Sequence, residues 1–242
     1  MPLTIYTGGA KGVDTHVERL CHLYGHACVV LIPPCHPRAK SLAPLTQSDL
    51  DAATPTVTQA AFRLGRQIHH PISLQYIQRN YRVIQPASLV LAVGYFEKCR
   101  KHLLGGTGWS VAMAQLLGKP LYVFDVDREQ WSWWNTTLGQ YQPCGGMTEE
   151  QIALPTLQDK TAIVGTREED QAIYPTLEAL FKNNEEKHCH RINHLFLITI
   201  SYCTSTTINF MADMTLIIKS SRFMTLSMVS YAGFLLPIIT GC

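Results

Sequence analysis

The sequence predicts an α/β protein with a Rossmann-like, doubly wound and mostly parallel sheet that carries helices on both faces. Two observations support this prediction. Short apolar runs typical of buried strands alternate with stretches whose apolar residues recur at helical spacing. Glycines or an aspartate follow several of these runs, at the strand ends where such sheets bind ligands. We expect this domain to occupy residues 1–185, followed by a polar linker and an apolar tail over residues 186–242.

The first strand–helix–strand unit takes up about thirty residues. Leu3–Thr7 is a short β-rich run that ends at a glycine pair, and the apolar residues between Val13 and Tyr24 fall at helical spacing. Gly25 is expected to end that helix. Ala27–Ile32 is a continuous apolar run, which predicts a strand buried on both faces of a parallel sheet.

A long segment marked by prolines, from Pro33 to Pro55, is expected to be irregular. Beyond it the pattern predicts, in order, helix Ser73–Ile84, strand Leu89–Gly94, a glycine turn at Gly105–Gly108, helix Trp109–Leu117, strand Leu121–Asp125, strand Thr161–Gly165 and helix Asp170–Phe181.

Charge is distributed unevenly along the 242 residues. The 20 basic and 18 acidic side chains give a formal net charge of +2, which does not favour a nucleic-acid binder. Only four of these 38 charges lie beyond residue 190, at Arg191, Asp213, Lys219 and Arg222. The chain enters its first strand pattern without the features of a secretory signal, so we expect a cytoplasmic protein with reduced thiols.

The first glycine turn follows the first predicted strand and consists of Gly8, Gly9, Ala10, Lys11 and Gly12, with Asp14 beyond it. Glycines permit close backbone approach, and free N–H groups at the following helix start favour an anion such as phosphate. Lys11 could add a positive charge, and Asp14 could cap the helix or bind a ribose hydroxyl. The alternative is a plain strand-to-helix turn in which Asp14 is only the N-cap.

The second glycine turn repeats this logic with Gly105, Gly106, Thr107, Gly108 and Trp109. Two such turns at the strand ends of one sheet could bracket a single nucleotide-like ligand. Gly94 and Gly165, at the ends of two further predicted strands, belong to the same edge of the sheet.

Three segments, in order along the chain, resemble a known superfamily. They are TGGAKGVD, then LVLAVGYF with GGTGWSVAMAQLLGKPLYVFD, then TAIVGTREEDQAI. Together they resemble the Rossmann-like SMF/DNA-processing-protein and Lonely-Guy (SLOG) superfamily, and most closely its molybdenum-cofactor-carrier-like branch, over roughly residues 3–182. The resemblance implies a carrier or sensor that binds a nucleotide-like or phosphorylated pterin-type ligand, of molybdopterin type among others.

The resemblance also extends the set of candidate site residues. Arg79 and Asn80 match an R-N pair of that branch, and Thr166 and Arg167 belong to its G-T-R motif. Arg79 could clamp a phosphate, or lie on a solvated helix face. The candidate ligand-binding residues are therefore Gly8, Gly9, Ala10, Lys11, Gly12, Asp14, Arg79, Asn80, Gly94, Gly105, Gly106, Thr107, Gly108, Trp109, Gly165, Thr166 and Arg167.

The superfamily also includes two other activities, which are the alternatives to a ligand carrier or sensor. Phosphoribohydrolases of the Lonely-Guy type use a glutamate, and Ala112 stands at that position here. Cleavage of an N-glycosidic bond would need another acid, for which Asp14 and Asp125 are the candidates; Asp125 could equally bind ribose or cap a helix. Single-stranded DNA binding, the activity of the DNA-processing relatives, needs a basic groove that the net charge does not favour.

Metal and aromatic patterns add little. Cys21, Cys28 and Cys35 are spaced by seven residues, which is no zinc pattern, and no metal held by protein side chains is expected. The WSWW run, Trp131 to Trp134, is interpreted mainly as packing on the sheet, with a stacking wall for a heterocycle as the alternative.

The tail leaves three alternatives open. Leu195–Ile218 is long enough to span a bilayer, but Asp213 would oppose insertion at a cost of about 2.5–3.5 kcal/mol. The tail could instead be an extension from alternative splicing or a gene-model error, or pack on the domain. The histidines from His188 to His194 are interpreted as part of the polar linker. Assembly into a homo-oligomer is left open.

Overall fold

The computed structural model describes residues 2–144 and 155–185. The chain divides into two units, Met1–Glu186 and Lys187–Cys242, and all described residues lie in the first. The expectations for the linker and the apolar tail therefore lie outside the described residues. Within the two described ranges, no helix is both long and apolar enough to cross a membrane.

The strands of the described residues form one sheet in the order β2-β1-β7-β3-β4-β5-β6. The strands from β2 to β4 run parallel, and β5 and β6 continue the sheet as an antiparallel hairpin. Their bounds are β1 Thr4–Thr7, β2 Ala27–Val30, β3 Leu89–Gly94, β4 Leu121–Asp125, β5 Gln130–Asn135, β6 Gln140–Pro143 and β7 Lys160–Gly165. This confirms the predicted mostly parallel sheet.

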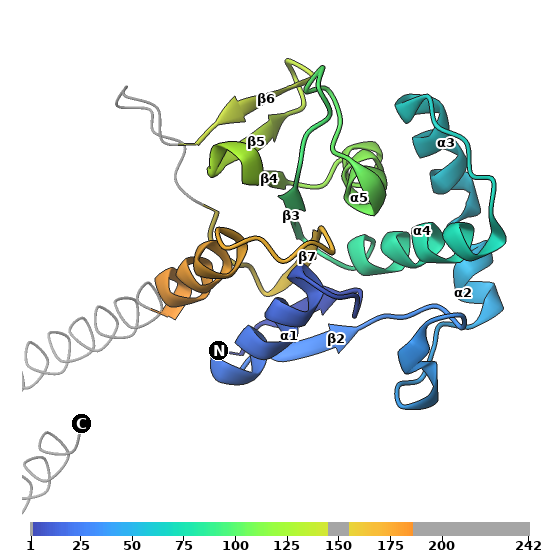
Figure 1. Ribbon diagram of the computed structural model, residues 1–242, viewed down its shortest axis with the longest axis horizontal. Coiled ribbons are helices and arrows are strands. Elements are labelled where there is room, and N and C mark those ends of the chain that lie inside the picture. The colour runs from blue at the N-terminus through green and yellow to red at the C-terminus, as the bar shows by residue number, and fades with distance from the viewer. Residues whose placement is uncertain (1, 145–154, 186–242) are drawn as a thin grey trace, which may run out of the picture. The chain divides into compact units, whose positions relative to one another are not determined.

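Helices cover both faces of the sheet, as predicted (Figure 1). One face packs against α1 (Val13–Leu23) and a helix over 173–185, and the other against α4 (Pro71–Ile84) and α5 (Gly105–Leu116), with α3 (Thr54–Leu64) packed on α5. The connections also contain α2 (Gln47–Asp51) and two short 3₁₀ helices, η1 (Pro37–Lys40) and η2 (Val126–Arg128). Because β1 leads to α1 on one face and β3 leads to α5 on the other, the sheet has a switch point at β7.

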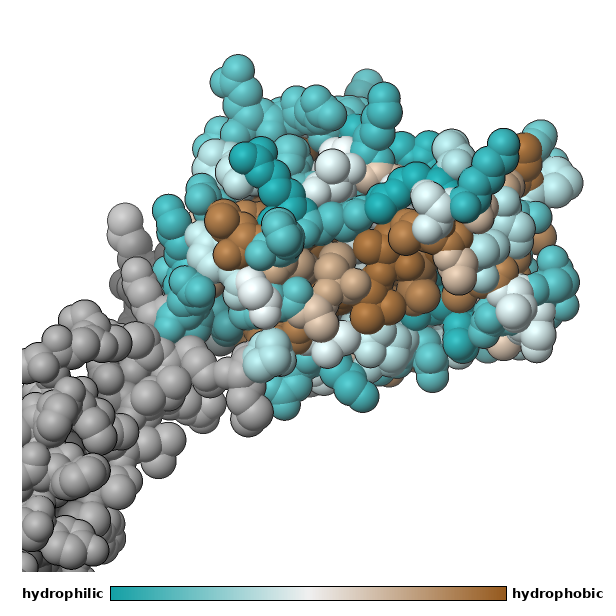
Figure 2. Space-filling model, turned by 90° about the horizontal axis from the view of Figure 1, so that it is seen from below, coloured by the Kyte–Doolittle hydropathy of each residue, from teal (hydrophilic) through white to brown (hydrophobic). Residues whose placement is uncertain are grey.

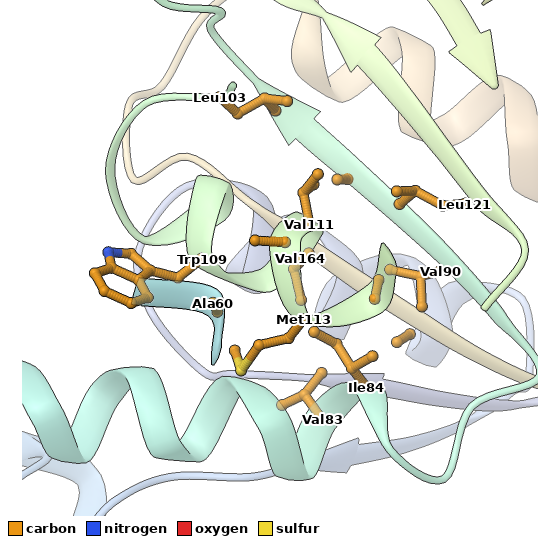
Figure 3. Close-up of a cluster of buried hydrophobic side chains, with 14 of the residues drawn as sticks. Ala60, Val83, Ile84, Val90, Leu103, Trp109, Val111, Met113, Leu121 and Val164 are labelled. Atoms are coloured by element: carbon orange, nitrogen blue, oxygen red, sulfur yellow. The ribbon is translucent and has the colours of Figure 1, made fainter. Parts of the chain in front are cut away.

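Helix α5 is buried on nearly all sides, because α3 and α4 cover the side that faces away from the sheet. Its Val111 and Met113 belong to one buried hydrophobic cluster with Val83, Ile84 and Val90 (Figure 3). This explains why α5 lacks the polar stripe of a surface helix. Truncating a fully buried side chain such as Met113 to alanine would cost about 2–5 kcal/mol of stability.

The structure corrects three sequence expectations. The apolar run at Ala27 was expected to form a strand buried on both faces, but β2 is an edge strand with half-buried side chains. Figure 2 views the molecule from below Figure 1 and shows a hydrophobic band across that face. The proline-marked segment contains η1, α2 and the start of α3, with Pro55 in the first turn of α3 where proline is tolerated. The glycines 105–108 form the first turn of α5 rather than a turn before it.

Candidate functional site

A cavity of the described residues lies at the carboxyl ends of β3 and β7, beside the first turn of α1. Its volume is about 670 Å³, within the range of small-molecule sites. Three segments after strands and one helix contribute to it: the first glycine turn, the start of α5, the loop after β7, and α4. Of the predicted site residues, those that line it are Ala10, Asp14, Arg79, Asn80, Gly94, Gly105, Gly106, Thr107, Trp109, Gly165, Thr166 and Arg167.

The other predicted site residues lie outside this lining: Gly8, Gly9, Lys11, Gly12, Gly108 and Asp125. Lys11 is exposed on the turn. A Cβ on Gly8 would overlap Nη1 of Arg79, and a Cβ on Gly12 would lie 2.5 Å from the carbonyl oxygen of Thr166. The glycines of the first turn are thus required by close packing of neighbouring groups.

Asp14 and Arg79 lie side by side at the floor of the cavity, each with only 6% of its side chain exposed. Oδ2 of Asp14 accepts a hydrogen bond from the Ala10 N–H at 3.0 Å and lies 3.7 Å from Nη1 of Arg79. Burial raises the pKa of the Asp14 carboxyl above its ordinary value, while the Arg79 charge opposes this shift. Burial likewise lowers the pKa of the Arg79 guanidinium.

Two alternatives from the sequence are wrong for this pair. Asp14 is not the N-cap of α1, because Gly12 holds that position and no side chain caps it. Arg79 does not lie on a solvated helix face, because it is almost fully buried.

A second arginine extends the positive charge toward the mouth of the cavity. The Cζ atoms of Arg167 and Arg79 lie 5.1 and 5.9 Å from the ring centroid of Tyr76, within cation–π range. Tyr76 lines the cavity, and His36 meets it edge-on behind, at 6.1 Å between ring centroids. The loop after β7 also brings the exposed Glu168 to the lining.

The start of α5 presents backbone N–H groups to the cavity. The first N–H groups of a helix have no intrahelical acceptor, and here they belong to Gly105, Gly106 and Thr107. The turn is held by side chains that donate to its carbonyls: Arg66 Nη2 to Leu103 at 2.9 Å, and Asn80 Nδ2 to Gly106 at 3.2 Å. Sequence analysis missed Arg66, for which no local pattern gives a signal.

The first glycine turn is held from the opposite side by the segment after β2. Arg38 forms a bidentate ion pair with Glu18 of α1 at 2.6 and 2.8 Å, and approaches the Gly9 carbonyl at 3.5 Å. His36 accepts the Arg38 N–H through Nδ1 at 3.1 Å. These contacts tie η1 to the turn and to α1.

The remaining candidates lie away from the cavity. Asp125 is buried at the end of β4, where Arg100 forms an ion pair with it and Arg128 lies 4.0 Å away; its side chain caps no helix. Ala112 lies within α5 and is buried in the hydrophobic core. Trp131 packs on Phe124, and Trp134 packs on Tyr141. Residues 2–144 and 155–185 contain no group of three or more side chains arranged to hold a metal ion.

Comparison with known proteins gives one similar structure. No family model matches the chain, and no curated protein matches it. Among solved structures, the chain is similar to a "Putative molybdenum carrier protein" from Syntrophus aciditrophicus, at 15% sequence identity and a TM-score of 0.41, over 74% of this chain and 94% of that one.

The cavity thus combines an end that carries two arginines with an apolar rim. Arg79, Arg167 and the first turn of α5 line the former. Ile72 and Leu104 form part of the lining although each is about half exposed, so they offer apolar surface at the mouth. This arrangement suits a small molecule with a negatively charged group at one end and a ring at the other.

Proposed function

We propose that the cavity binds a small phosphorylated molecule, nucleotide-like or pterin-type, and that the protein acts as its carrier or sensor. The observation that carries this proposal is that the hydrogen-bond donors of the buried Arg79 guanidinium are not all satisfied. A guanidinium has five N–H donors, yet the ion-pair partner that the described residues offer Arg79, Asp14, lies beyond hydrogen-bond distance at 3.7 Å, and Nε is buried without a partner. Buried polar groups normally have partners, so a ligand anion would complete this one.

The surroundings of Arg79 support a phosphate over a carboxylate as that anion. Arg167 and the free N–H groups at the start of α5 offer donors from two further directions. Several donors that converge from different elements match the several acceptor oxygens of a phosphate. Tyr76 and Trp109, which also line the cavity, are aromatic surface for a heterocycle.

Titration of the purified protein with adenosine monophosphate tests the proposal, with heat of binding as the readout. Arg79→Met should weaken binding about 10- to 100-fold, because a charge-assisted hydrogen bond contributes about 1.5–3 kcal/mol. Arg82→Met is the matched control, since Arg82 lies on the same helix but forms a surface ion pair with Asp49. Arg167→Met, at an exposed position, tests the same site without a change in the buried pair.

Binding of this probe that is unchanged in both Arg79→Met and Arg167→Met would contradict the proposal. Native mass spectrometry of the protein purified from its source would then show whether a different ligand is retained. The expected result is a retained phosphorylated small molecule that is absent from the Arg79→Met variant.

One observation favours a second candidate function, the hydrolysis of a nucleotide N-glycosidic bond. Asp14 is a carboxylic acid in the cavity whose pKa is raised by burial, as a general acid requires. Asp125 does not line this cavity. Release of free base from nucleoside monophosphates, lost in Asp14→Asn, would establish this activity. Intact nucleotides after prolonged incubation would leave binding as the function.

A further inference from the structure

Among the described residues, Asp14 and Arg79 form the one ion pair at the floor of the cavity, and both are almost fully buried. The other groups around Asp14 do little to offset its charge. The Ala10 N–H donates to it, and Thr7 lies beside it on β1. Glu18 and Cys28 also lie within electrostatic reach, but Glu18 is occupied by Arg38. Arg79 is therefore the one cation that compensates the Asp14 carboxylate.

A phosphate or sulfate bound to Arg79 would change this balance. The same guanidinium would then face two negative groups, the bound anion and the Asp14 carboxylate, in a buried site where charges are weakly screened. Leaving both ionised is unfavourable, as it is when two carboxylates share one site. A proton on Asp14 removes the repulsion and converts an acceptor into an O–H donor that faces the anion.

We propose that the cavity takes up its oxyanion together with one proton, and that this proton binds to the Asp14 carboxylate. The inference rests on the proposed function, because it concerns the anion held by Arg79. It makes Asp14 a proton-dependent part of the anion site, and it makes affinity depend on pH. Burial, which already raises the pKa of the Asp14 carboxyl in the free protein, brings this protonation closer to neutral pH.

One other group could take up a proton on binding. The pKa of His36 is lowered by burial and by the charges of Arg79, Arg38 and Arg167, so an anion among these arginines would raise it. His36 does not line the cavity, however, and its Nδ1 already accepts the Arg38 N–H. Asp14 faces Arg79 directly, which makes it the nearer acceptor.

Sulfate is the probe, because it stays a dianion near neutral pH and contributes no proton of its own. Calorimetric titration of the full-length protein in two buffers of different ionisation enthalpy counts the protons taken up. The titration covers the range from about pH 5 to 8. Where Asp14 is ionised in the free protein but protonated in the complex, we expect about one proton taken up per sulfate bound. In that part of the range the sulfate affinity should fall about tenfold per pH unit. Sulfate binding without proton uptake anywhere in this range would overturn the inference and leave the proposed function intact.

The Asp14→Asn variant tests whether Asp14 is the residue that takes up the proton. An asparagine amide imitates the protonated carboxyl, so this variant should bind sulfate without pH dependence, about as tightly as the unmodified protein at the acid end of the range. Asp49→Asn is the matched control, since it removes the same charge from an ion pair with Arg82 outside the cavity, and it should keep the pH dependence. Persistence of the pH dependence in Asp14→Asn would place the proton elsewhere and overturn the inference.

The experiment separates this inference from the proposed function. Absence of sulfate and nucleotide binding at every pH would overturn both together. If Asp14→Asn does not fold, as a melting curve would show, the proton count of the unmodified protein still decides: zero protons overturns the inference, and about one supports it.

Discussion

The two glycine turns look alike in the sequence but differ in the structure. Each contains three glycines and lies where a helix starts at the carboxyl end of the sheet. In the first turn the glycines lie against other groups, with Arg79 at Gly8 and the Thr166 carbonyl at Gly12. In the second, Gly105 has a positive φ of +59° although a Cβ there would meet nothing within 4 Å, and a Cβ on Gly106 would meet only Asn80 at 3.9 Å.

This difference shows that glycine serves two purposes at one site. In the first turn glycine lets a buried arginine and the loop after β7 come close, which places the Arg79–Asp14 pair. In the second turn glycine leaves the start of α5 open to the cavity, apart from Gly108, which packs on the Leu103 carbonyl. Substitution at Gly12 in the first turn should therefore affect the fold, whereas substitution at Gly106 in the second should affect ligand binding.

The largest effect is expected for Gly12→Ala. Gly12 has φ of +76° and ψ of −127°, a conformation that residues with a Cβ rarely adopt, and the added methyl would meet backbone atoms of Thr166 and Arg167. We expect a loss of about 3 kcal/mol in the free energy of unfolding, measured by urea denaturation. A loss below about 1 kcal/mol would show that the first turn can relax.

Gly106→Ala should have the opposite profile. The position is helical and the new methyl has space, so the stability should stay within about 1 kcal/mol and rise if anything. Because Gly106 lines the cavity, the methyl should occupy ligand space and weaken adenosine monophosphate binding about tenfold or more. Calorimetry and a melting curve on the same sample test both parts. Destabilisation as large as in Gly12→Ala would remove the distinction between the two turns.

Much of the fold could be predicted because local signals decide it. Strands buried on both faces require continuous apolar runs, so β3, β4 and β7 are visible in the sequence. The same signal misled at β2, since a run of apolar residues does not reveal that the strand lies at the edge. Helix α3 was missed because its proline suggested irregular structure, although proline fits the first turn of a helix.

The site was only partly predictable because its contacts join distant segments. The motif resemblance found Arg79 and Asn80, but the sequence could not show that the guanidinium of Arg79 lies against Gly8. Arg66 reaches a carbonyl 37 residues away, which no local pattern encodes. The order that puts β7 between β1 and β3 is likewise a property of the assembled sheet. Which of two similar turns faces the ligand depends on these long-range contacts.

The smallest effect expected is a pH dependence of amide hydrogen exchange that is confined to the first turn. His36 has a pKa below its ordinary value of 6.5, mainly because it is buried, so the unfolded chain takes up a proton before the folded one does. The stability that neutral His36 contributes is therefore present above about pH 6.5 and is lost as the pH falls below it. Because His36 and Arg38 hold the Gly9 region, amide hydrogen exchange there should speed up in mild acid, while the start of α5 should not respond. His36→Gln should remove this response; equal acceleration in both turns would mean that the acid effect is global and that His36 does not control the first turn.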